Sequence, residues 1–434
     1  MNKKSGFWRR LVNQLWFVPA ACVLGAILLA QLMVGLDRMI PPDSDSIWVD
    51  WVYAVGIDGS RSMLSAIGGS MLGVAATAFS ITISVVATAS STYGPRLVRN
   101  FMADRINQVV LGVLVSTFIY TLLVLRTIRS ASDDLASPFV PHIAVNFAVL
   151  LAIADVALLV YFIHHIADSV QVNTLAHGVR RRFLTVIERW YPEETPEEMT
   201  RTLSDRPGGE LIRAEKTGYI VDMDFEKIRS CAEEKDLRVT MIPGSGTISC
   251  RASRCFGSGR NRSRTTWRRH CGARWPWGDS RSALQDIRFA EQQVVELAVR
   301  ALSTGTNDPY TAINAVQEVA PGIVTAVSRP VPGDTVVVDG VPRFSYRTIG
   351  PAEIVDMPFD QIRPHISGQV EVAEALIDLA ARIEAATIHS SIEDLARQHV
   401  NLVVEQFRRD DPVDRDLKRV EDYAAKRLTF TSEG

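Results

Sequence analysis

Four stretches of almost uninterrupted apolar residues dominate the first 170 positions of the chain. They cover about residues 15–36, 63–89, 109–125 and 143–163. A helix rises about 1.5 Å per residue, so roughly 20 apolar residues cross a hydrocarbon core about 30 Å thick. We therefore predict a four-span transmembrane domain over residues 1–170, which makes the fold class membrane α-helical at its start.

The second span carries small and hydroxyl-bearing residues on one face. Steps of three and four place them together on a helix, and a face of this kind in lipid is expected to turn inward. It either lets helices pack closely or forms one wall of a polar pathway through the membrane. The stripe consists of Gly69, Gly73, Thr77, Ser80, Ser84, Thr88 and Ser91.

The fourth span contains ionisable groups. Asp155 lies at mid-span, where a carboxylate is costly unless it is protonated, paired or hydrated, so we expect it to face the bundle. It is either a protonated carboxyl hydrogen-bonded to a hydroxyl of the second span or a proton or cation site. His164 and Asp168 are spaced i, i+4 and could form half of a metal site. The absence of further ligands nearby favours interfacial side chains and no metal.

Charge in the joints between spans predicts the orientation of the chain. Basic residues occur before the first span, after the second and after the fourth, whereas the other two joints are richer in acid. By the positive-inside bias, both termini are cytoplasmic. The basic start also suits a signal peptide, but the apolar run continues well past Cys22, so we expect a retained first span.

The remainder of the chain has the composition of a cytosolic protein. The averages over the whole chain, a mean hydropathy of +0.08 and a formal net charge of −2, do not show this difference between its two halves. We predict a helical extension and acidic linker over residues 171–215, then a cytoplasmic α+β domain over 216–350. Its elements include strands at 218–224 and 237–242, a helix at 225–235, and a hairpin turning at Asp339 and Gly340. Residues 351–434 form a helical C-terminal region, with breaks near 390–391 and 411–412.

Two amphipathic helices are expected inside this half. One spans Ala283 to Leu302 and ends where Gly305 would supply a left-handed cap. Asp308 then caps the next helix with Pro309 at its first position. The same turn could instead bind an anion through Asn307, Asp308 and Thr311. Farther on, an apolar stripe must pack on the domain or on another subunit: Val372, Leu376, Leu379 and Ile383.

Residues 245–278 break the pattern of their surroundings. Between Ser245 and Trp277 there is no Lys, Asp or Glu but eight arginines. A zinc site is rejected because His270 and Cys271 are adjacent and no paired knuckle spacing occurs, and nucleic-acid binding is rejected because a simpler origin exists. If codons that encode residues 245–278 are read two bases later, they can encode a different sequence with acidic residues and strand-like apolar runs. This shifted sequence rejoins the chain smoothly at Asp279. We therefore predict a frameshift over residues 245–278.

Resequencing the gene across the codons for Ile242 to Gln285 tests the frameshift. A shifted frame removes the arginine cluster and restores a β module. The printed frame, if it stands, contradicts the hypothesis and identifies this chain as a damaged copy.

Short motifs along most of the chain resemble a bacterial family described only as predicted membrane proteins, number twenty-two fifty-four in the domain-of-unknown-function series. The resemblance implies four spans and a cytoplasmic domain in the bacterial inner (plasma) membrane, with no activity to carry over. It also implies a small or apolar residue at position 155, so a role for Asp155 would be particular to this chain. The motifs include Phe17-Val18-Pro19, Tyr93-Gly94-Pro95-Arg96, Phe162-Ile163-His164-His165-Ile166, Gln285-Asp286, Ala301-Leu302-Ser303 and Asn307-Asp308-Pro309 with Thr311-Ala312.

The sequence contains no Gly-rich phosphate loop, nucleophile elbow or reliable cysteine knuckle, so we do not expect an enzyme, a cofactor or a nucleic-acid partner. The leading hypothesis is a scaffold or sensor that couples a cytoplasmic domain to the membrane bundle. The alternative is an oligomeric ion channel or transporter lined by the hydroxyl face of the second span. We expect the lipid bilayer and further copies of the chain as partners, with any small ligand or ion unknown.

Overall fold

The structure is a computed structural model of the 434-residue chain that divides into two compact units, Met1–Gln171 and Val172–Gly434. The residues it describes are 16–39, 56–93, 105–129, 139–169, 171–194, 199–200, 210–213, 218–221, 223–234, 236, 238–241, 248–249, 254–258, 277–278 and 280–430.

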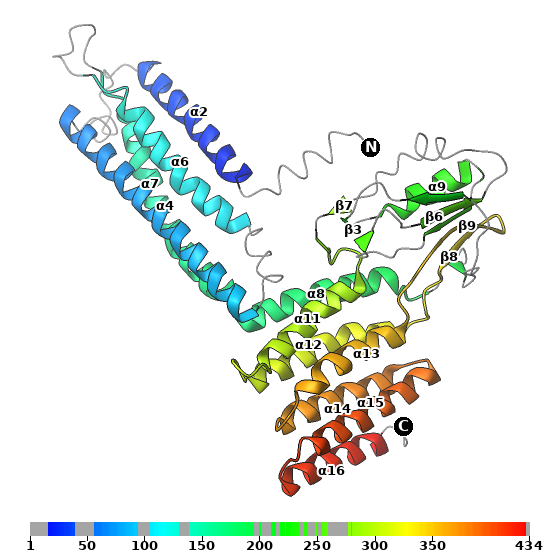
Figure 1. The fold of residues 1–434 in the computed structure, drawn as a ribbon. Coiled ribbons are helices and arrows are strands. Elements are labelled where there is room, and N and C mark those ends of the chain that lie inside the picture. Colours follow the sequence, from blue (N-terminus) through cyan, green and yellow to red (C-terminus); the bar gives the residue numbers. More distant parts are fainter. Residues whose placement is uncertain are drawn as a thin grey trace. The chain divides into compact units, whose positions relative to one another are not determined.

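The first unit is a bundle of four long apolar helices (Figure 1). Each is long and apolar enough to cross a membrane, as the hydropathy pattern predicted. The third of them packs against the other three and is the centre of the bundle. The helices are α2 (Phe17–Met39), α4 (Ile57–Tyr93), α6 (Arg105–Leu125) and α7 (His142–Ser169).

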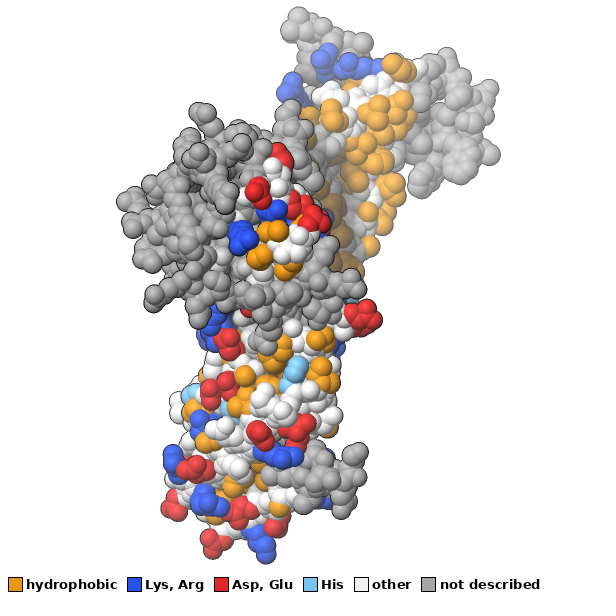
Figure 2. All heavy atoms as spheres, turned by 90° about the vertical axis from the view of Figure 1, so that its right-hand side faces the viewer, with side chains coloured by type: hydrophobic (Ala, Val, Ile, Leu, Met, Phe, Trp, Pro, Cys, Tyr) orange, Lys and Arg blue, Asp and Glu red, His pale blue; other side chains and the backbone are white. Residues whose placement is uncertain are grey.

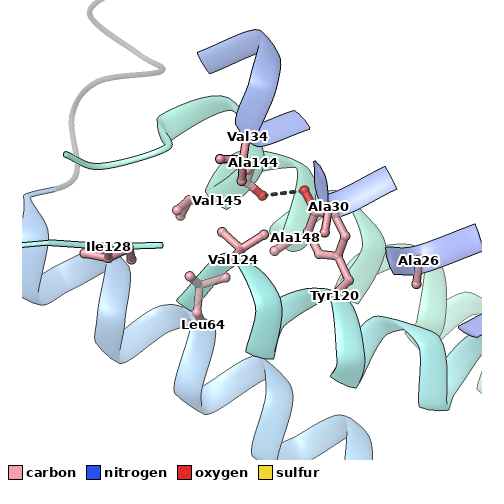
Figure 3. Close-up of a cluster of buried hydrophobic side chains, with 10 residues drawn as sticks. All are labelled: Ala26, Ala30, Val34, Leu64, Tyr120, Val124, Ile128, Ala144, Val145 and Ala148. Carbon is pink, nitrogen blue, oxygen red and sulfur yellow. Dashed lines mark hydrogen bonds between the residues drawn. The ribbon is translucent and has the colours of Figure 1, made fainter. Parts of the chain in front are cut away.

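Two apolar clusters fill the bundle, one towards each end of α6. The first joins all four helices and includes Ala30, Leu64, Tyr120 and Ala148 (Figure 3). The second joins α4, α6 and α7 through Met71, Ala75, Ala78, Val110, Leu114, Phe162 and Ile166.

Glycines allow the close helix contacts of the bundle. A Cβ on Gly68 would lie 2.8 Å from Thr121 Oγ1, and one on Gly112 would lie 3.0 Å from both Pro19 Cα and Cys22 Sγ. These two positions therefore set how closely α4 and α2 approach α6, as small residues do at membrane helix interfaces.

The start of α7 is capped by a side chain from α2. Asp37 accepts hydrogen bonds from the backbone N–H of Ile143 at 2.8 Å and of Ala144 at 3.0 Å. A carboxylate suits this place because the first N–H groups of a helix lack intrahelical partners and carry partial positive charge. Tyr120 donates its hydroxyl to the Ala144 carbonyl at 3.0 Å, so α2 and α6 both hold the same turn of α7 (Figure 3).

The second unit contains a stack of helices. The breaks expected near residues 390 and 411 are confirmed. The apolar stripe from Val372 to Ile383 is buried within this unit, where α14 packs against α12, α15 and α16. The helices are α8 (Val172–Trp190), α11 (Ile287–Ala301), α12 (Pro309–Val327), α13 (Pro351–Ile362), α14 (Val370–Ala386), α15 (Ser390–Arg409) and α16 (Asp414–Phe430), with a 3-10 turn, η1 (Arg363–His365).

Helix α8 is buried along one face in this stack. Its apolar residues Ala176, Val179, Phe183, Val186 and Ile187 are buried, and it packs against α11 and α12. After the fourth span, α7 ends at Ser169 and α8 begins at Val172.

A six-stranded sheet lies in the same unit, with the strand order β1-β8-β9-β4-β6-β2. Helix α9 (Phe225–Glu234) packs with it around a core that includes Ile228, Phe344 and Tyr346. All neighbouring strands are antiparallel except β4 and β9, which are parallel. The strands are β1 (Met199–Thr200), β2 (Glu210–Arg213), β4 (Arg238–Met241), β6 (Arg254–Ser258), β8 (Thr335–Val338) and β9 (Val341–Tyr346).

The hairpin expected at Asp339 and Gly340 is confirmed, since β8 and β9 pair across these two residues and both have positive φ. A second, three-stranded sheet has the order β5-β3-β7, with β5 (Ile248–Ser249), β3 (Gly218–Ile220) and β7 (Trp277–Gly278). Within residues 245–278 the structure describes only the strands β5, β6 and β7. The rest of that segment lies outside the described residues, and the frameshift stays a prediction.

Gln285 joins the β layer to the helices. Its amide accepts from the Met223 N–H at 2.7 Å and donates to the Met223 carbonyl at 2.9 Å. Its own carbonyl accepts from the indole N–H of Trp190 at 2.9 Å. The next residue, Asp286, caps α11 through the Phe289 N–H and pairs with Arg281. Burial raises the pKa of Asp286 although Arg281 opposes this shift.

The turn between α11 and α12 corrects one expectation. Gly305 does not have a positive φ, and α11 ends at Ala301 with its C-cap residue, Leu302, in the right-handed helical region. The left-handed residue of this turn is Asn307, with φ +45°. Asn tolerates this conformation because its short polar side chain can bond locally.

Gly322 of α12 lies directly against the ring of Phe183, so a Cβ there would come within 2.2 Å of a ring carbon. We expect Gly322→Val to push α8 from α12 and lower the free energy of unfolding by about 1–3 kcal/mol. Thermal unfolding of the full chain measures this. Gly178→Ala is the matched control, because that helical glycine meets nothing within 4 Å and alanine there should stabilise by about 0.5–1 kcal/mol. Equal stability of Gly322→Val and wild type would contradict the packing argument.

Candidate functional site

The hydroxyl stripe of the second span lies on the outside of the single bundle. Thr77, Ser80, Ser84 and Thr88 are all exposed on α4, while the opposite face of this helix is buried against α6 and α7. Figure 2 shows that hydrophobic side chains also cover much of the visible bundle surface. Within one chain, therefore, the stripe does not line an interior.

Hydrogen bonds within α4 satisfy two of these hydroxyls. Thr77 donates to the Gly73 carbonyl at 3.0 Å, and Thr88 donates to the Ser84 carbonyl at 3.0 Å. Bonds of this kind let a threonine face lipid or another helix without an unsatisfied donor. Gly69 and Gly73 extend the same exposed face, and neither would meet an atom within 4 Å if a Cβ were added. The stripe is a surface onto which another helix could pack closely.

Asp155 is separated from the stripe and lies inside the bundle with 1% of its surface exposed. On α7 it falls between Leu151 and Leu158, which pack against the first and the second apolar cluster, respectively. The hydroxyl that interacts with the Asp155 carboxyl is the buried one of Thr117 in α6, and not a hydroxyl of the second span. Neither carboxylate oxygen has a partner at hydrogen-bonding geometry.

His164 Nε2 lies 3.3 Å from a carboxylate oxygen of Asp168 near the end of α7, and these side chains are 76% and 53% exposed. Among the described residues, no group of three or more His, Cys, Asp or Glu side chains could hold a metal ion. This i, i+4 pair is therefore a surface contact in the part of the chain that the structure describes.

Asn307, Asp308 and Thr311 lie together at the start of α12, where Asp308 is the N-cap residue. One Asp308 oxygen accepts from the Thr311 N–H at 3.1 Å, and the other accepts from the Thr311 hydroxyl at 2.6 Å. The Asn307 side chain accepts from Gln369 at 3.1 Å. The chain's own carboxylate thus occupies the start of α12, where an added anion would have to compete with it.

A cavity of about 150 Å³ lies between α12, α14 and α16. Its acidic rim is already paired: Arg419 donates to Glu374 at 2.8 Å, and Arg427 lies 2.8 Å from Asp378. The carboxylates on this rim therefore form salt-bridged contacts between helices α14 and α16.

The sequence interpretation missed Glu291, a fully buried carboxyl in α11. Its exposed fraction is 0%, and neither side-chain oxygen has a hydrogen-bond partner. The position offered one signal, because Glu291 follows Ile287 by four residues and precedes Val295 by four, on the apolar face of an amphipathic helix. Burial raises the pKa of Glu291 well above its ordinary value, and nearby Arg288 only partly opposes this.

Glu291→Gln is expected to stabilise the chain, and more so at higher pH. Below the ordinary carboxyl pKa, Glu291 is protonated in both the folded and the unfolded chain. Above it, the unfolded chain ionises first, so wild-type stability falls by up to about 1.4 kcal/mol per pH unit until the raised pKa is passed. Unfolding measured at about pH 5 and about pH 8 should show a gap between variant and wild type that widens with pH. Glu296→Gln, on the half-buried side of the same helix, is the control. A gap independent of pH would refute the assignment.

Comparison with known proteins agrees with the membrane-helix geometry. Two mycobacterial proteins, the uncharacterized protein Rv1290c of Mycobacterium tuberculosis and the uncharacterized protein Mb1321c of Mycobacterium bovis, are each 29% identical over 429 residues. Each alignment covers 94% of this chain and 79% of the relative. No solved structure matches the chain. Residues 12–382 match the family of predicted membrane proteins known as DUF2254, and the chain belongs to that family.

Proposed function

We propose that this chain is a multi-pass protein of the bacterial inner membrane in which the bundle and the second unit are coupled, so that it acts as a scaffold or sensor. In this proposal the second unit and both termini are cytoplasmic, and the protein carries out no catalytic step. The basic residues before α2 and within α8 support this orientation through the positive-inside bias.

One observation carries the proposal: the last apolar helix of the bundle, α7, is followed almost directly by α8, which is a core helix of the second unit. Only Val170 and Gln171 separate α7 from α8. Within the second unit, the ring of Phe183 in α8 packs against Gly322 of α12. The Glu318 carboxylate of α12 lies 2.9 Å from His177 Nδ1 and 3.1 Å from Arg180 Nε of α8. A shift or rotation of α7 would therefore pass through only two connecting residues to α8, which is packed in the second unit.

A flexible insertion tests this coupling. A short Gly-Ser linker between Ser169 and Val172 should leave both units folded but disconnect them mechanically. The bundle is then perturbed by Gly68→Leu, which forces α4 from Thr121, and hydrogen exchange of α8 and α12 is measured in nanodiscs. We expect Gly68→Leu to speed exchange in α8 and α12 several-fold with the native connection and to have no effect through the linker.

Gly25→Leu provides the control, because it adds the same bulk at an exposed α2 position with no atom within 4 Å. It should leave exchange unchanged in both backgrounds. The same response to Gly68→Leu with and without the linker would rule out coupling through α8.

The exposed hydroxyl stripe favours a second candidate, an oligomeric channel or transporter. Because the stripe faces away from its own bundle, it could line a pathway only where several copies bring their α4 helices together. Close packing between copies through Gly69 and Gly73 uses the same surface without a pathway.

Ion flux in proteoliposomes separates these alternatives. We expect Ser84→Leu or Thr88→Val to reduce flux in a folded protein if the stripe lines a pathway. Phe79→Leu, which changes an exposed apolar residue of α4 outside the stripe, should not. No flux of any common ion through wild type would exclude the channel and leave the coupled scaffold or sensor.

A further inference from the structure

Asp155 combines three features that the proposed coupling does not use. It is ionisable, it is almost completely buried, and both of its oxygens lack a hydrogen-bond partner. A carboxylate in this state within a membrane bundle would lose its hydration without compensation, which is among the most costly arrangements for a charged side chain. The carboxyl must therefore be neutral or bound to a cation.

In the described part of the bundle, no charged side chain lies where it could compensate a negative charge on Asp155. The charged residues of the helices packed around α7 all lie near helix ends: Asp37 and Arg38 in α2, Asp58 and Arg61 in α4, and Arg105 in α6. Among the described residues, the polar side chain that interacts with the Asp155 carboxyl is Thr117, and its hydroxyl is not at hydrogen-bonding geometry.

The oxygen count distinguishes a proton from a metal cation. Hard metal cations take about six or more oxygen ligands, whereas a proton needs only one acceptor. The carboxyl and one threonine hydroxyl supply three oxygens, and no metal-binding cluster occurs among the described residues.

We propose that Asp155 is a proton-binding site, which holds its proton while α6 and α7 are packed and releases it only when these helices part. On release the carboxyl O–H bond breaks, the electron pair stays on the carboxylate, and the proton passes to water that enters between the helices. The apolar clusters on both sides, with Leu114 and Phe162 towards one end and Tyr120 and Ala148 towards the other, keep water out of the closed site.

Infrared difference spectroscopy tests the protonation directly. The full chain is reconstituted in nanodiscs, and the spectrum of Asp155→Asn is subtracted from that of wild type at about pH 6. We expect a carboxylic acid C=O band to remain in this difference spectrum, because the band of buried Glu291 is common to both proteins and cancels. The remaining band should be unchanged when sodium chloride replaces choline chloride. Carboxylate bands in its place, or loss of the acid band on adding sodium, would overturn the proton assignment.

Thermal unfolding tests the coupling to helix packing. Between about pH 6 and about pH 9 the wild-type Tm should fall, since ionisation favours the parted helices, whereas Asp155→Asn should show a weaker dependence. Asp58→Asn makes the same chemical change at an exposed α4 position and should keep the wild-type dependence. Equal pH dependence of all three proteins would reject proton release by helix parting. If Asp155→Asn does not fold, wild type and Thr117→Val labelled with ¹³C-aspartate provide the comparison, with a shifted acid band expected in the variant and an unshifted band counting against the site.

Discussion

The second unit depends on the burial of α8. This helix comes first in the chain of its unit, yet the surface that covers it is built from α11 and α12, more than a hundred residues later. Gly322 lets α12 lie directly against the Phe183 ring of α8. At the edge of the same contact, the Glu318 carboxylate of α12 lies next to His177 and Arg180 of α8. The end of α8 is tied as well, because the Tyr191 hydroxyl donates to the Ile349 carbonyl at 2.6 Å. Packing at α8 therefore organises the helices and the sheet around one element.

Buried polar groups in the structure fall into two kinds. Gln285 and Asp37 have partners for their polar atoms and act as joints between elements distant in sequence. Glu291 and Asp155 are buried carboxyls whose oxygens have no partner at hydrogen-bonding geometry among the described residues. Groups of the first kind stabilise and specify a fold, whereas groups of the second kind cost stability and mark places where a change of protonation has structural consequences.

The features that could be predicted from the sequence are those determined by residues close together in the chain. Four apolar runs were sufficient for the four helices, because lipid-crossing length and composition leave little choice. The Asp339-Gly340 turn followed from two residues that accept positive φ, and Asp308 with Pro309 identified the start of α12. The Val372 to Ile383 stripe correctly identified a buried face.

Features that depend on tertiary contacts were not predictable in the same way. Periodicity placed the hydroxyls of α4 on one face, but only packing with α6 and α7 determines that this face points outward. The left-handed turn residue was Asn307 and not Gly305, since the preference of glycine for this conformation is weaker than the constraints of the surrounding turn. Glu291 sits in an apolar pattern that a charged residue would normally interrupt, so the helix was recognised and its anomaly was missed.

The cap from Asp37 to α7 also bears on how the protein is made. The carboxylate and its two N–H partners are separated by 106 and 107 residues, so α2 is synthesised long before the helix start that it completes. Until then, the end of α2 has an unmatched negative charge and α7 has no acceptor for its first amides. The contacts that complete the end of α2 and the start of α7 can therefore form only after the last of the four helices has been made.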